Sequence, residues 1–390
     1  MNNSKNDRIV LIDSLRGYAL MGLFLVHMME YFELYWFPPP QKTELVTSVV
    51  FALFGGKAYA MFAMLFGVSF YIILKRNADR GNDFRLRFLW RVTLLLMIGY
   101  LHGLIYSGDV LQILAVAGLL LLPLWLAPSW LVLLLSALML LQATSYAFVG
   151  WMGQSANAYV HPFYDQIQTA VYPSYANGSL LSVLSANASG GTMGKWSFML
   201  ESGRFATVVG MSLLGFSLAR INFFTDFERH GKRYLPLLVV ALLAVAGCYF
   251  SNHLFQSIPH PEKMDEAWMS ILDMYFNTLL ALVSVLTFML LYQIRTIQNV
   301  LKLLAAPGRM TLSFYVAQSM VMVPFFYHFG GNAYRWIGQT WSLILGVVLW
   351  VLQVALAQWW VKHFNYGPLE WCWRAATYGS TNIPFKRLSN

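Results

Sequence analysis

The stretch IVLIDSLRGYALMGLFLVHMMEYF, residues 9–32, decides the fold class, because it is long and apolar enough to cross a membrane as a helix. Asp13, Arg16 and His27 interrupt it. Arg16 and His27 are eleven residues apart, almost three helical turns, so they share one face and lie roughly 16 Å apart along the axis. Asp13 precedes Arg16 by one turn and is placed to neutralise it. Because charge is costly in hydrocarbon, this stripe predicts a functional polar track that enters a bilayer.

The composition of the whole chain points the same way. Of its 390 residues, 58% are hydrophobic and only 11% are charged, against roughly 25% charged in an average soluble protein. We therefore predict one integral membrane domain over residues 1–390. The formal charge of +9 comes from short basic clusters between apolar runs, which is typical of membrane topology and argues against nucleic-acid binding. Cys248 and Cys372 show no metal-ligand spacing, so we expect no metal.

Apolar runs of spanning length recur along the chain and predict an all-α, polytopic transmembrane helix bundle of about ten spans. They cover residues 9–32, 46–74, 92–107, 110–127, 129–150, 204–219, 234–252, 268–292, 311–328 and 341–361. Basic clusters follow the second, sixth and eighth runs, so all three fall on one side. An even number of spans places both termini there too, with Lys5 and Arg8 at the start. The positive-inside rule identifies this side as the cytoplasmic face.

The opposite side carries the longer polar connections. These are the proline run 38–40, the turn at 107–109 and a long periplasmic loop over residues 150–197 that is rich in Ser, Asn, Gly and Tyr. A connection of that length is commonly functional or disordered. Both interpretations stay open: a lid over an outward-facing cavity, or a mobile loop.

Ionisable residues within the spans are the candidate functional residues. His27 has the chemistry of a general base, and the alternative is a histidine that bonds two helices together. Arg16 suits bidentate contact with a phosphate or carboxylate, and the alternative is a paired interfacial anchor. Lys57 reads either as a snorkelling side chain or as a cation in a site. His102 and Asp109 share a helical face, which fits proton handling and structural bonding equally.

Several stretches together resemble the YeiB family of bacterial integral membrane proteins. They are DSLRGYALMG (13–22), FAMLFG (62–67), GYLHGLIYSGDVL (99–111), GRMTLSFYVAQ (308–318) and GPLEWCWR (367–374). The last of these is the most specific. The resemblance implies a multi-pass membrane protein and by itself implies no particular activity.

The first stretch also resembles a wider superfamily of transmembrane acyltransferases, whose hallmark is an arginine, ten residues and a histidine. Arg16 and His27 fit that spacing. The resemblance implies that an acyl-CoA, with acetyl-CoA as the expected donor, approaches from the cytoplasm as co-substrate. Arg16 would then help to bind it, and His27 would help to activate an acceptor from the outer side.

The candidate site residues follow from this resemblance together with the buried charges. We predict His27, His102 and Asp109 for catalysis, and Asp13, Arg16, Lys57, Arg309 and Gln318 for donor binding. Lys57, His102 and Gln318 are also candidates to stabilise the oxyanion of an acyl-transfer intermediate. Arg309 and Arg374 either bind CoA phosphates or simply follow the inside bias of basic residues.

The function predicted is a membrane acyltransferase that moves an acetyl or similar group from cytoplasmic acyl-CoA to a hydroxyl or amine of an envelope glycan, lipid or small molecule. The alternative is a proton-coupled transporter or exporter of a small solute, in which the same polar residues line a path. A third hypothesis is a non-catalytic membrane partner that binds through the long loop. The expected partners are the lipid bilayer, the acyl-CoA and the envelope acceptor, with a homodimer as one open assembly state.

Overall fold

The computed structural model describes residues 9–36, 43–145, 162–258 and 262–387. Lys5, Arg8, the proline run 38–40 and residues 150–161 of the predicted loop lie outside the described residues. Everything that follows concerns the described part of the chain.

Most of the described chain is helical, and its one β-contact is an isolated bridge between Phe364 and Lys386. The elements are α1 (Val10–Met29), η1 (Leu34–Trp36), α2 (Leu45–Leu53), α3 (Ala58–Ala78), α4 (Arg85–Gly103), α5 (Leu111–Leu121), η2 (Leu122–Leu126), α6 (Ser129–Leu140), α8 (Pro162–Asn177), α9 (Leu180–Ala186), η3 (Asn187–Gly191), α10 (Thr192–Glu201), α11 (Arg204–Arg220), α12 (Phe227–Gln256), α13 (Glu262–Tyr292), α14 (Arg295–Leu301), η4 (Lys302–Leu304), α15 (Ala305–Gly308), α16 (Thr311–Phe326), η5 (Ala333–Arg335), α17 (Gln339–His363) and α18 (Pro368–Tyr378).

Several helices are long and apolar enough to cross a membrane, which confirms the predicted class of a multi-pass helical bundle. There are five within the described residues: Val10–Met29, Leu45–Ala78, His230–Gln256, Trp268–Tyr292 and Gln339–His363. A sixth follows if Leu180–Glu201 and Arg204–Arg220, which meet at a bend of 70°, form one span. Shorter apolar helices run over Leu111–Leu126, Ser129–Leu140 and Thr311–Phe326. The total of ten spans stays a prediction.

Some boundaries differ from the predicted runs for local reasons. The second run is divided into α2 and α3 at Gly56, whose φ of 71° is a conformation that favours glycine. A Cβ at Gly56 would also lie 2.5 Å from the side chain of Asn277. The fifth run ends as helix at Leu140, just before Gln142, whose φ of 56° breaks the helical path.

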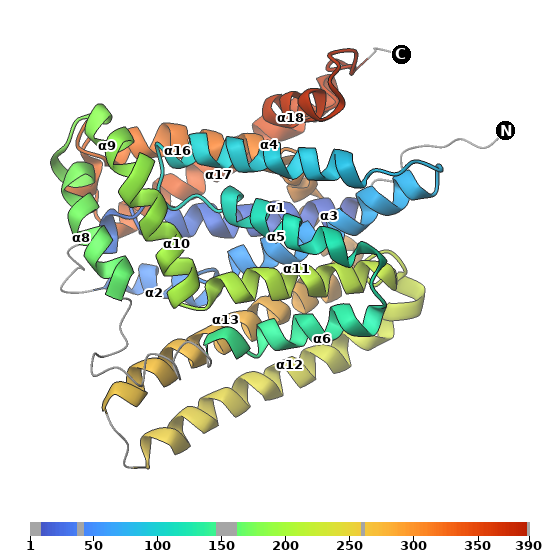
Figure 1. Cartoon of the computed structure of the whole chain (residues 1–390), viewed down its shortest axis with the longest axis horizontal. Coiled ribbons are helices and arrows are strands. Elements are labelled where there is room, and N and C mark those ends of the chain that lie inside the picture. Colours follow the sequence, from blue (N-terminus) through green and yellow to red (C-terminus); the bar gives the residue numbers. More distant parts are fainter. Residues whose placement is uncertain (1–8, 37–42, 146–161, 259–261, 388–390) are drawn as a thin grey trace.

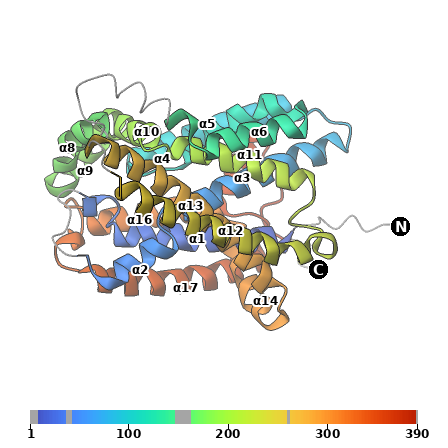
Figure 2. The same cartoon turned by 90° about the horizontal axis from the view of Figure 1, so that it is seen from below.

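The start of α1 and helix α18 lie at the same end of the bundle (Figure 1), and the α3–α4, α11–α12 and α13–α14 connections lie there as well (Figures 1 and 2). We call this the basic end, because the predicted basic clusters fall in these connections. The opposite end carries α8, α9 and α10, and we call it the loop end. The arrangement matches the charge pattern that the sequence predicts.

The described part of the long loop is helical. Residues 162–201 form α8, α9, η3 and α10, which pack on one another at the loop end (Figure 1). Tyr175 of α8 donates a hydrogen bond of 2.5 Å to Asn187 of η3, and Asn187 in turn donates one of 3.0 Å to the carbonyl oxygen of Leu104. The loop therefore forms a folded cap that is bonded to the bundle.

Helix α1 lies inside the bundle, and its backbone touches its neighbour α15 directly. A Cβ at Gly17 would lie 2.0 Å from the carbonyl oxygen of Leu304, and one at Gly308 would lie 1.7 Å from that of Asp13. Two glycines thus let the helices approach at backbone distance. This contact fixes the depth of the polar stripe of α1 within the bundle.

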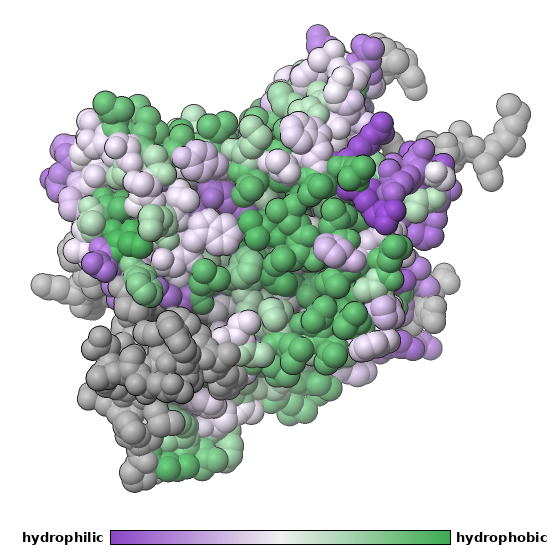
Figure 3. Space-filling view, in the orientation of Figure 1, coloured by the Kyte–Doolittle hydropathy of each residue, from purple (hydrophilic) through white to green (hydrophobic). Residues whose placement is uncertain are grey.

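The molecular surface has the distribution expected of a membrane protein. Apolar residues cover the middle of the face shown in Figure 3, whereas hydrophilic residues gather towards the two ends. Helix α12 is the extreme case, since only 11% of its most apolar window is buried inside the protein. Its exposed apolar side chains are suited to contact lipid.

Candidate functional site

The polar stripe of α1 is held by ion pairs and hydrogen bonds. Arg16 Nη1 lies 2.8 Å from Asp13 Oδ1, so the predicted pairing of these residues is present. Arg16 Nη2 donates a hydrogen bond of 2.6 Å to Ser69 Oγ on α3. The guanidinium is therefore oriented by α1 and α3 together.

A cavity of about 360 Å³ opens around Arg16, and we call it the inner cavity. Its walls combine apolar side chains with arginines from separate elements: Arg16 on α1, Arg76 on α3, Arg91 on α4, Arg309 after α15, and Arg374 on α18. Clustered arginines with apolar walls suit a ligand that has both anionic and apolar parts.

A second cavity, of about 730 Å³, lies on the other side of the stripe and contains His27. We call it the outer cavity. Charged side chains of both signs line it: Glu30, Glu33, Lys57, Asp109, Asp165, Lys195, Arg204 and Asp273. Aromatic side chains such as Trp36, Tyr59 and Tyr164 complete the wall. Part of this wall comes from α8 and α10, so the folded cap closes over this cavity.

The two cavities adjoin. Leu23 and Val110 line both of them, so these residues form the partition between the inner and the outer space. Tyr315, which lines the inner cavity, accepts a hydrogen bond of 3.1 Å from the backbone N–H of Val110. The partition thus consists of Leu23 on α1 and the segment at Val110, whose backbone is held by Tyr315 of α16.

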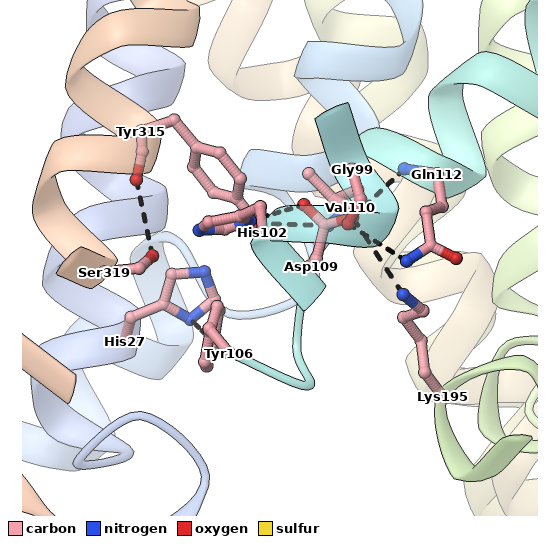
Figure 4. A network of polar contacts seen from close by, with 10 residues as sticks. All are labelled: His27, Gly99, His102, Tyr106, Asp109, Val110, Gln112, Lys195, Tyr315 and Ser319. Carbon is pink, nitrogen blue, oxygen red and sulfur yellow. Dashed lines mark hydrogen bonds and ion pairs between the residues drawn. The ribbon is translucent and has the colours of Figure 1, made fainter. Parts of the chain in front are cut away.

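His27 lies at this junction with one ring nitrogen engaged. Its Nδ1 is 2.8 Å from the hydroxyl of Tyr106 and 3.4 Å from Glu30 Oε2 (Figure 4). Its Nε2 is buried and has no hydrogen-bond partner among the described residues. A buried imidazole nitrogen without a partner in a cavity wall is available to a ligand.

His102 and Asp109 form a second buried pair. His102 Nδ1 lies 2.8 Å from Asp109 Oδ1, while Asp109 Oδ2 accepts a bond of 3.1 Å from the backbone N–H of Gln112 (Figure 4). Lys195 Nζ lies 3.9 Å from the same carboxylate. The aromatic ring of Tyr315 packs against both histidines, with centroid distances of 5.2 Å to His102 and 6.5 Å to His27. The two histidines therefore belong to one packed cluster.

The turn after α1 is strained and brings further acids to the cluster. Tyr31, Phe32 and Glu33 have φ values of 48°, 51° and 86°, which non-glycine residues seldom adopt. Tyr327 holds the turn by donating a bond of 2.8 Å to the carbonyl oxygen of Phe32. Glu33 then accepts a bond of 3.4 Å from the Tyr106 hydroxyl. Burial, together with the charge of Glu30, raises the pKa of Glu33 to about 8, which lets the two acids lie side by side.

Six of the eight predicted residues line one of the two cavities, whereas His102 lines neither and contacts the outer cavity wall through its bond to Asp109. Asp13, Arg16 and Arg309 line the inner cavity, whereas His27, Lys57 and Asp109 line the outer one. Lys57 donates a hydrogen bond of 3.1 Å to the carbonyl oxygen of Phe51 and is buried, so it does not snorkel towards the membrane surface.

Gln318 does not join the other predicted residues. Its amide donates a bond of 2.8 Å to Gln353 on α17, and neither cavity wall includes it. Its polarity is satisfied by a contact between two helices, which the sequence of α16 alone does not reveal.

Sequence reasoning missed Tyr106, Tyr315, Glu30 and Glu33. Tyr106 lies inside the conspicuous stretch 99–111, and the two acids follow His27 within six residues. The proximity of Glu30 and Glu33 to His27 was a usable signal. Tyr315 gave none, because aromatic residues are common in membrane helices. No group of residues suited to a metal ion occurs in the described part of the chain.

The fold and the two cavities define a multi-pass helical membrane protein with a buried polar site. The family described as "Heparan-alpha-glucosaminide N-acetyltransferase, catalytic" matches residues 8–160, which include Arg16, His27, His102 and Asp109. The family described as "Protein of unknown function (DUF418)" matches residues 218–380, which include Arg309, Gln318 and the closing stretch. The two matches cover separate parts of the chain, and residues 161–217 lie between them.

Two relatives match the chain over nearly its full length. The chain is 25% identical over 418 residues to "Uncharacterized protein YeiB" of Escherichia coli (strain K12), covering 98% of this chain and 100% of the relative. It is 24% identical over 398 residues to "Uncharacterized protein YxaH" of Bacillus subtilis (strain 168), covering 96% and 95%. The resemblance to the YeiB family, close to the transmembrane acyltransferases, is thereby confirmed.

Proposed function

We propose that this protein is a membrane acyltransferase that takes an acyl group from acyl-CoA in the inner cavity and transfers it to a hydroxyl or amine in the outer cavity. The observation that carries the proposal is the pair of adjoining cavities, with Arg16 on one, His27 on the other and Leu23 with Val110 between them. The match to an N-acetyltransferase catalytic family over residues 8–160 supports this reaction class.

The inner cavity suits the donor. Its arginines supply the charge that phosphate groups need, and Phe62, Leu65 and Phe66 supply an apolar wall for the arm that carries the acyl group. A pantetheine arm is about half as long as a bilayer is thick, so a donor held at the basic end reaches towards mid-depth. Its thioester would then meet the partition beside His27. Acetyl-CoA is the donor we expect.

His27 is suited to act as the general base through Nε2. We assign the hydrogen to Nδ1, which donates it to the Tyr106 hydroxyl 2.8 Å away, so that Nε2 keeps its lone pair. Nε2 takes the proton of the acceptor hydroxyl or amine as its oxygen or nitrogen attacks the thioester carbonyl. A new C–O or C–N bond forms, the C–S bond breaks, and the proton passes from His27 to the departing thiolate of CoA.

Lys57 is the candidate that the cavities favour for stabilising the oxyanion. It lines the same cavity as His27, whereas Gln318 lies on neither wall. His102 and Asp109 lie at the partition, and there they would position Tyr315 and Val110 around the reacting groups. We place the basic end in the cytoplasm of a bacterial cell and the acceptor on the outer side of its inner membrane.

The adjoining cavities also suit the alternative function, a proton-coupled transporter. A translocation path requires two opposed cavities with a thin partition between them. His27, Glu30 and Glu33, which line the outer cavity, are titratable groups that could carry protons along such a path. The two functions differ in one measurable respect, because only the acyltransferase consumes the thioester.

The test is acyl transfer in proteoliposomes that contain purified protein, with labelled acetyl-CoA on one side and an envelope extract on the other. We expect label in the extract and release of free CoA. His27→Ala should reduce both rates by at least 100-fold, because general-base catalysis contributes about 10²–10⁴-fold. The affinity of His27→Ala for acetyl-CoA should equal that of the wild type. His328→Ala, an exposed histidine at the loop end, is the matched control.

Two results would overturn the proposal. One is wild-type transfer by His27→Ala. The other is the absence of both CoA release and acetyl-CoA binding in the wild type, combined with solute flux that follows an imposed pH gradient, which would establish the transporter instead.

A further inference from the structure

The closing stretch Gly367–Arg374 builds one wall of the inner cavity. Gly367 and Pro368 start α18, and Glu370, Trp373 and Arg374 of that helix line the cavity. Figure 1 shows α18 at the basic end, beside α4. The most specific stretch of the sequence thus lies on the same cavity as Arg16, although the two are far apart in the chain.

Glu370 anchors this wall to α16. Its carboxylate accepts hydrogen bonds from the backbone N–H groups of Leu312 (2.8 Å) and Ser313 (3.1 Å) and from the Ser313 hydroxyl. The same hydroxyl accepts a bond of 3.0 Å from the N–H of Leu369. The carboxylate of Glu370 is therefore bonded at the start of α16, where a carboxylate is favoured.

Gly367 is required by this anchor. A Cβ at Gly367 would lie 2.2 Å from Glu370 Oε2 and 2.8 Å from Ser313 Oγ. Any larger residue would push the carboxylate away from α16. Glycine, proline and glutamate in the closing stretch together set the position of the side chains that follow.

Those side chains place two arginines on the cavity, each stacked on an aromatic ring. The guanidinium carbon of Arg91 lies 3.6 Å from the centroid of the Trp373 ring, and that of Arg374 lies 5.1 Å from the Tyr366 ring. The Trp373 indole also donates a bond of 2.8 Å to the carbonyl oxygen of Arg91. Among the described residues, no carboxylate forms an ion pair with Arg91 or Arg374.

This arrangement differs from that of Arg16. Arg16 is paired with Asp13, whereas Arg91 and Arg374 line the same cavity without an ion pair among the described residues. Holding two cations together costs free energy unless an anion binds between them. Stacking on aromatic rings orients both guanidinium groups before a ligand binds, which lowers the entropy lost on binding.

We propose that Arg91 and Arg374 form the subsite for the phosphate groups at the nucleotide end of the donor, and that the closing stretch exists to build it. This inference rests on the proposed function, since it assigns part of the acyl-CoA site. Arg16, deeper in the cavity and paired, would instead lie beside the pantetheine arm. The same chemistry would also bind a phospholipid headgroup, so the test must separate the two sources.

The experiment measures ligand binding to the full chain in lipid nanodiscs by calorimetry. The ligands are acetyl-CoA, acetyl-3′-dephospho-CoA and S-acetylpantetheine, which carry progressively fewer phosphate groups. Arg374→Gln and Arg91→Gln should each weaken acetyl-CoA binding about 10- to 100-fold, the range of a charged hydrogen bond. Binding of S-acetylpantetheine should not change. Arg87→Gln is the matched control, because Arg87 stacks on Tyr378 at 5.7 Å but is exposed and outside the cavity.

The outcomes separate the two proposals. Acetyl-CoA binding that is unchanged in Arg374→Gln and Arg91→Gln overturns the subsite and leaves the acyltransferase intact. An equal loss of S-acetylpantetheine affinity in the two variants also overturns the subsite, because the arginines would then act on the structure of the cavity and not on the phosphate groups. No acetyl-CoA binding by the wild type overturns the proposed donor and the subsite together.

The lipid source is tested in discs with and without anionic phosphatidylglycerol. If the two substitutions change only the thermal stabilisation by the anionic lipid, and not acetyl-CoA binding in neutral discs, the subsite binds a headgroup and the inference is wrong.

Discussion

At the scale of single residues, the reactive character of His27 depends on what engages its other nitrogen. The Tyr106 hydroxyl, 2.8 Å from Nδ1, engages that nitrogen, while Nε2 has no hydrogen-bond partner among the described residues. Tyr106 is itself fully buried, and its hydroxyl also bonds to Glu33. Rotation of the His27 ring would therefore break the bond to Tyr106 and disturb the bond between Tyr106 and Glu33. Histidines in catalytic sites commonly depend on such a second contact for their tautomer and direction.

Tyr106→Phe should therefore lower the turnover number for acyl transfer roughly 10- to 100-fold, corresponding to about 1.5–3 kcal/mol of transition-state stabilisation. The KM for acetyl-CoA should stay near its wild-type value, because Tyr106 does not line the inner cavity. Steady-state kinetics with varied acetyl-CoA measures both constants.

Tyr234→Phe is the control for this substitution. Tyr234 is equally buried, but its hydroxyl donates to the carbonyl oxygen of Phe223, remote from both cavities. A wild-type turnover number in Tyr106→Phe would show that His27 is oriented by other groups.

At the scale of helices, close backbone contacts hold the two halves of the site in register. Helix α3 carries Ser69, which orients Arg16, and it packs on α11 through Gly67 and Gly215. A Cβ at Gly215 would lie 1.9 Å from the carbonyl oxygen of Met64. In a membrane, where apolar side chains gain little by leaving lipid, such contacts carry much of the helix association.

Gly215→Ala should accordingly destabilise the protein by about 1–3 kcal/mol, the usual cost of overpacking. Gly247→Ala on α12 is the matched control, since nothing lies within 4 Å of its added Cβ. Alanine forms helix more readily than glycine, so the control should keep or slightly raise the melting temperature. Thermal unfolding in detergent compares the two variants, and equal melting temperatures would contradict the proposed contact.

At the scale of the whole molecule, the different linings of the two cavities give the proposed acyl transfer a direction across the membrane. The arginines of the inner cavity lie towards the basic end, and the folded cap of residues 162–201 forms part of the wall of the outer cavity, nearer the loop end. The proposed reaction therefore requires the basic end to face the compartment that holds acyl-CoA.

This orientation can be tested with a native cysteine. Cys372 on α18 is exposed at the basic end, so a membrane-impermeant maleimide should label it in inside-out vesicles and not in intact cells. The background is Cys248→Ala, which removes the other cysteine of the chain. Thr169→Cys, exposed on α8, should show the opposite pattern in a Cys248→Ala, Cys372→Ser background. Labelling of Cys372 in intact cells would reverse the proposed direction of transfer.

The sequence by itself determined the features that depend on local spacing. Helical periodicity placed Asp13, Arg16 and His27 on one stripe. His102 and Asp109 do lie 2.8 Å apart, but α4 ends at Gly103, so the turn before α5 and not a shared helical face brings Asp109 to His102. The lengths of the apolar runs determined the class of fold, because a bilayer admits few other solutions.

The tertiary structure decided which of these residues meet. Periodicity states which face a side chain occupies but not which helix packs against that face, so the sequence did not show that Gln318 bonds to α17 or that Tyr106 and Tyr315 join the cluster. The convergence of Arg91 with Arg374 depends on how α18 docks on α4 and α16, through contacts between residues 282 and 58 positions apart in the chain. Such contacts are fixed by packing and capping across the whole bundle, and no local pattern in the chain records them.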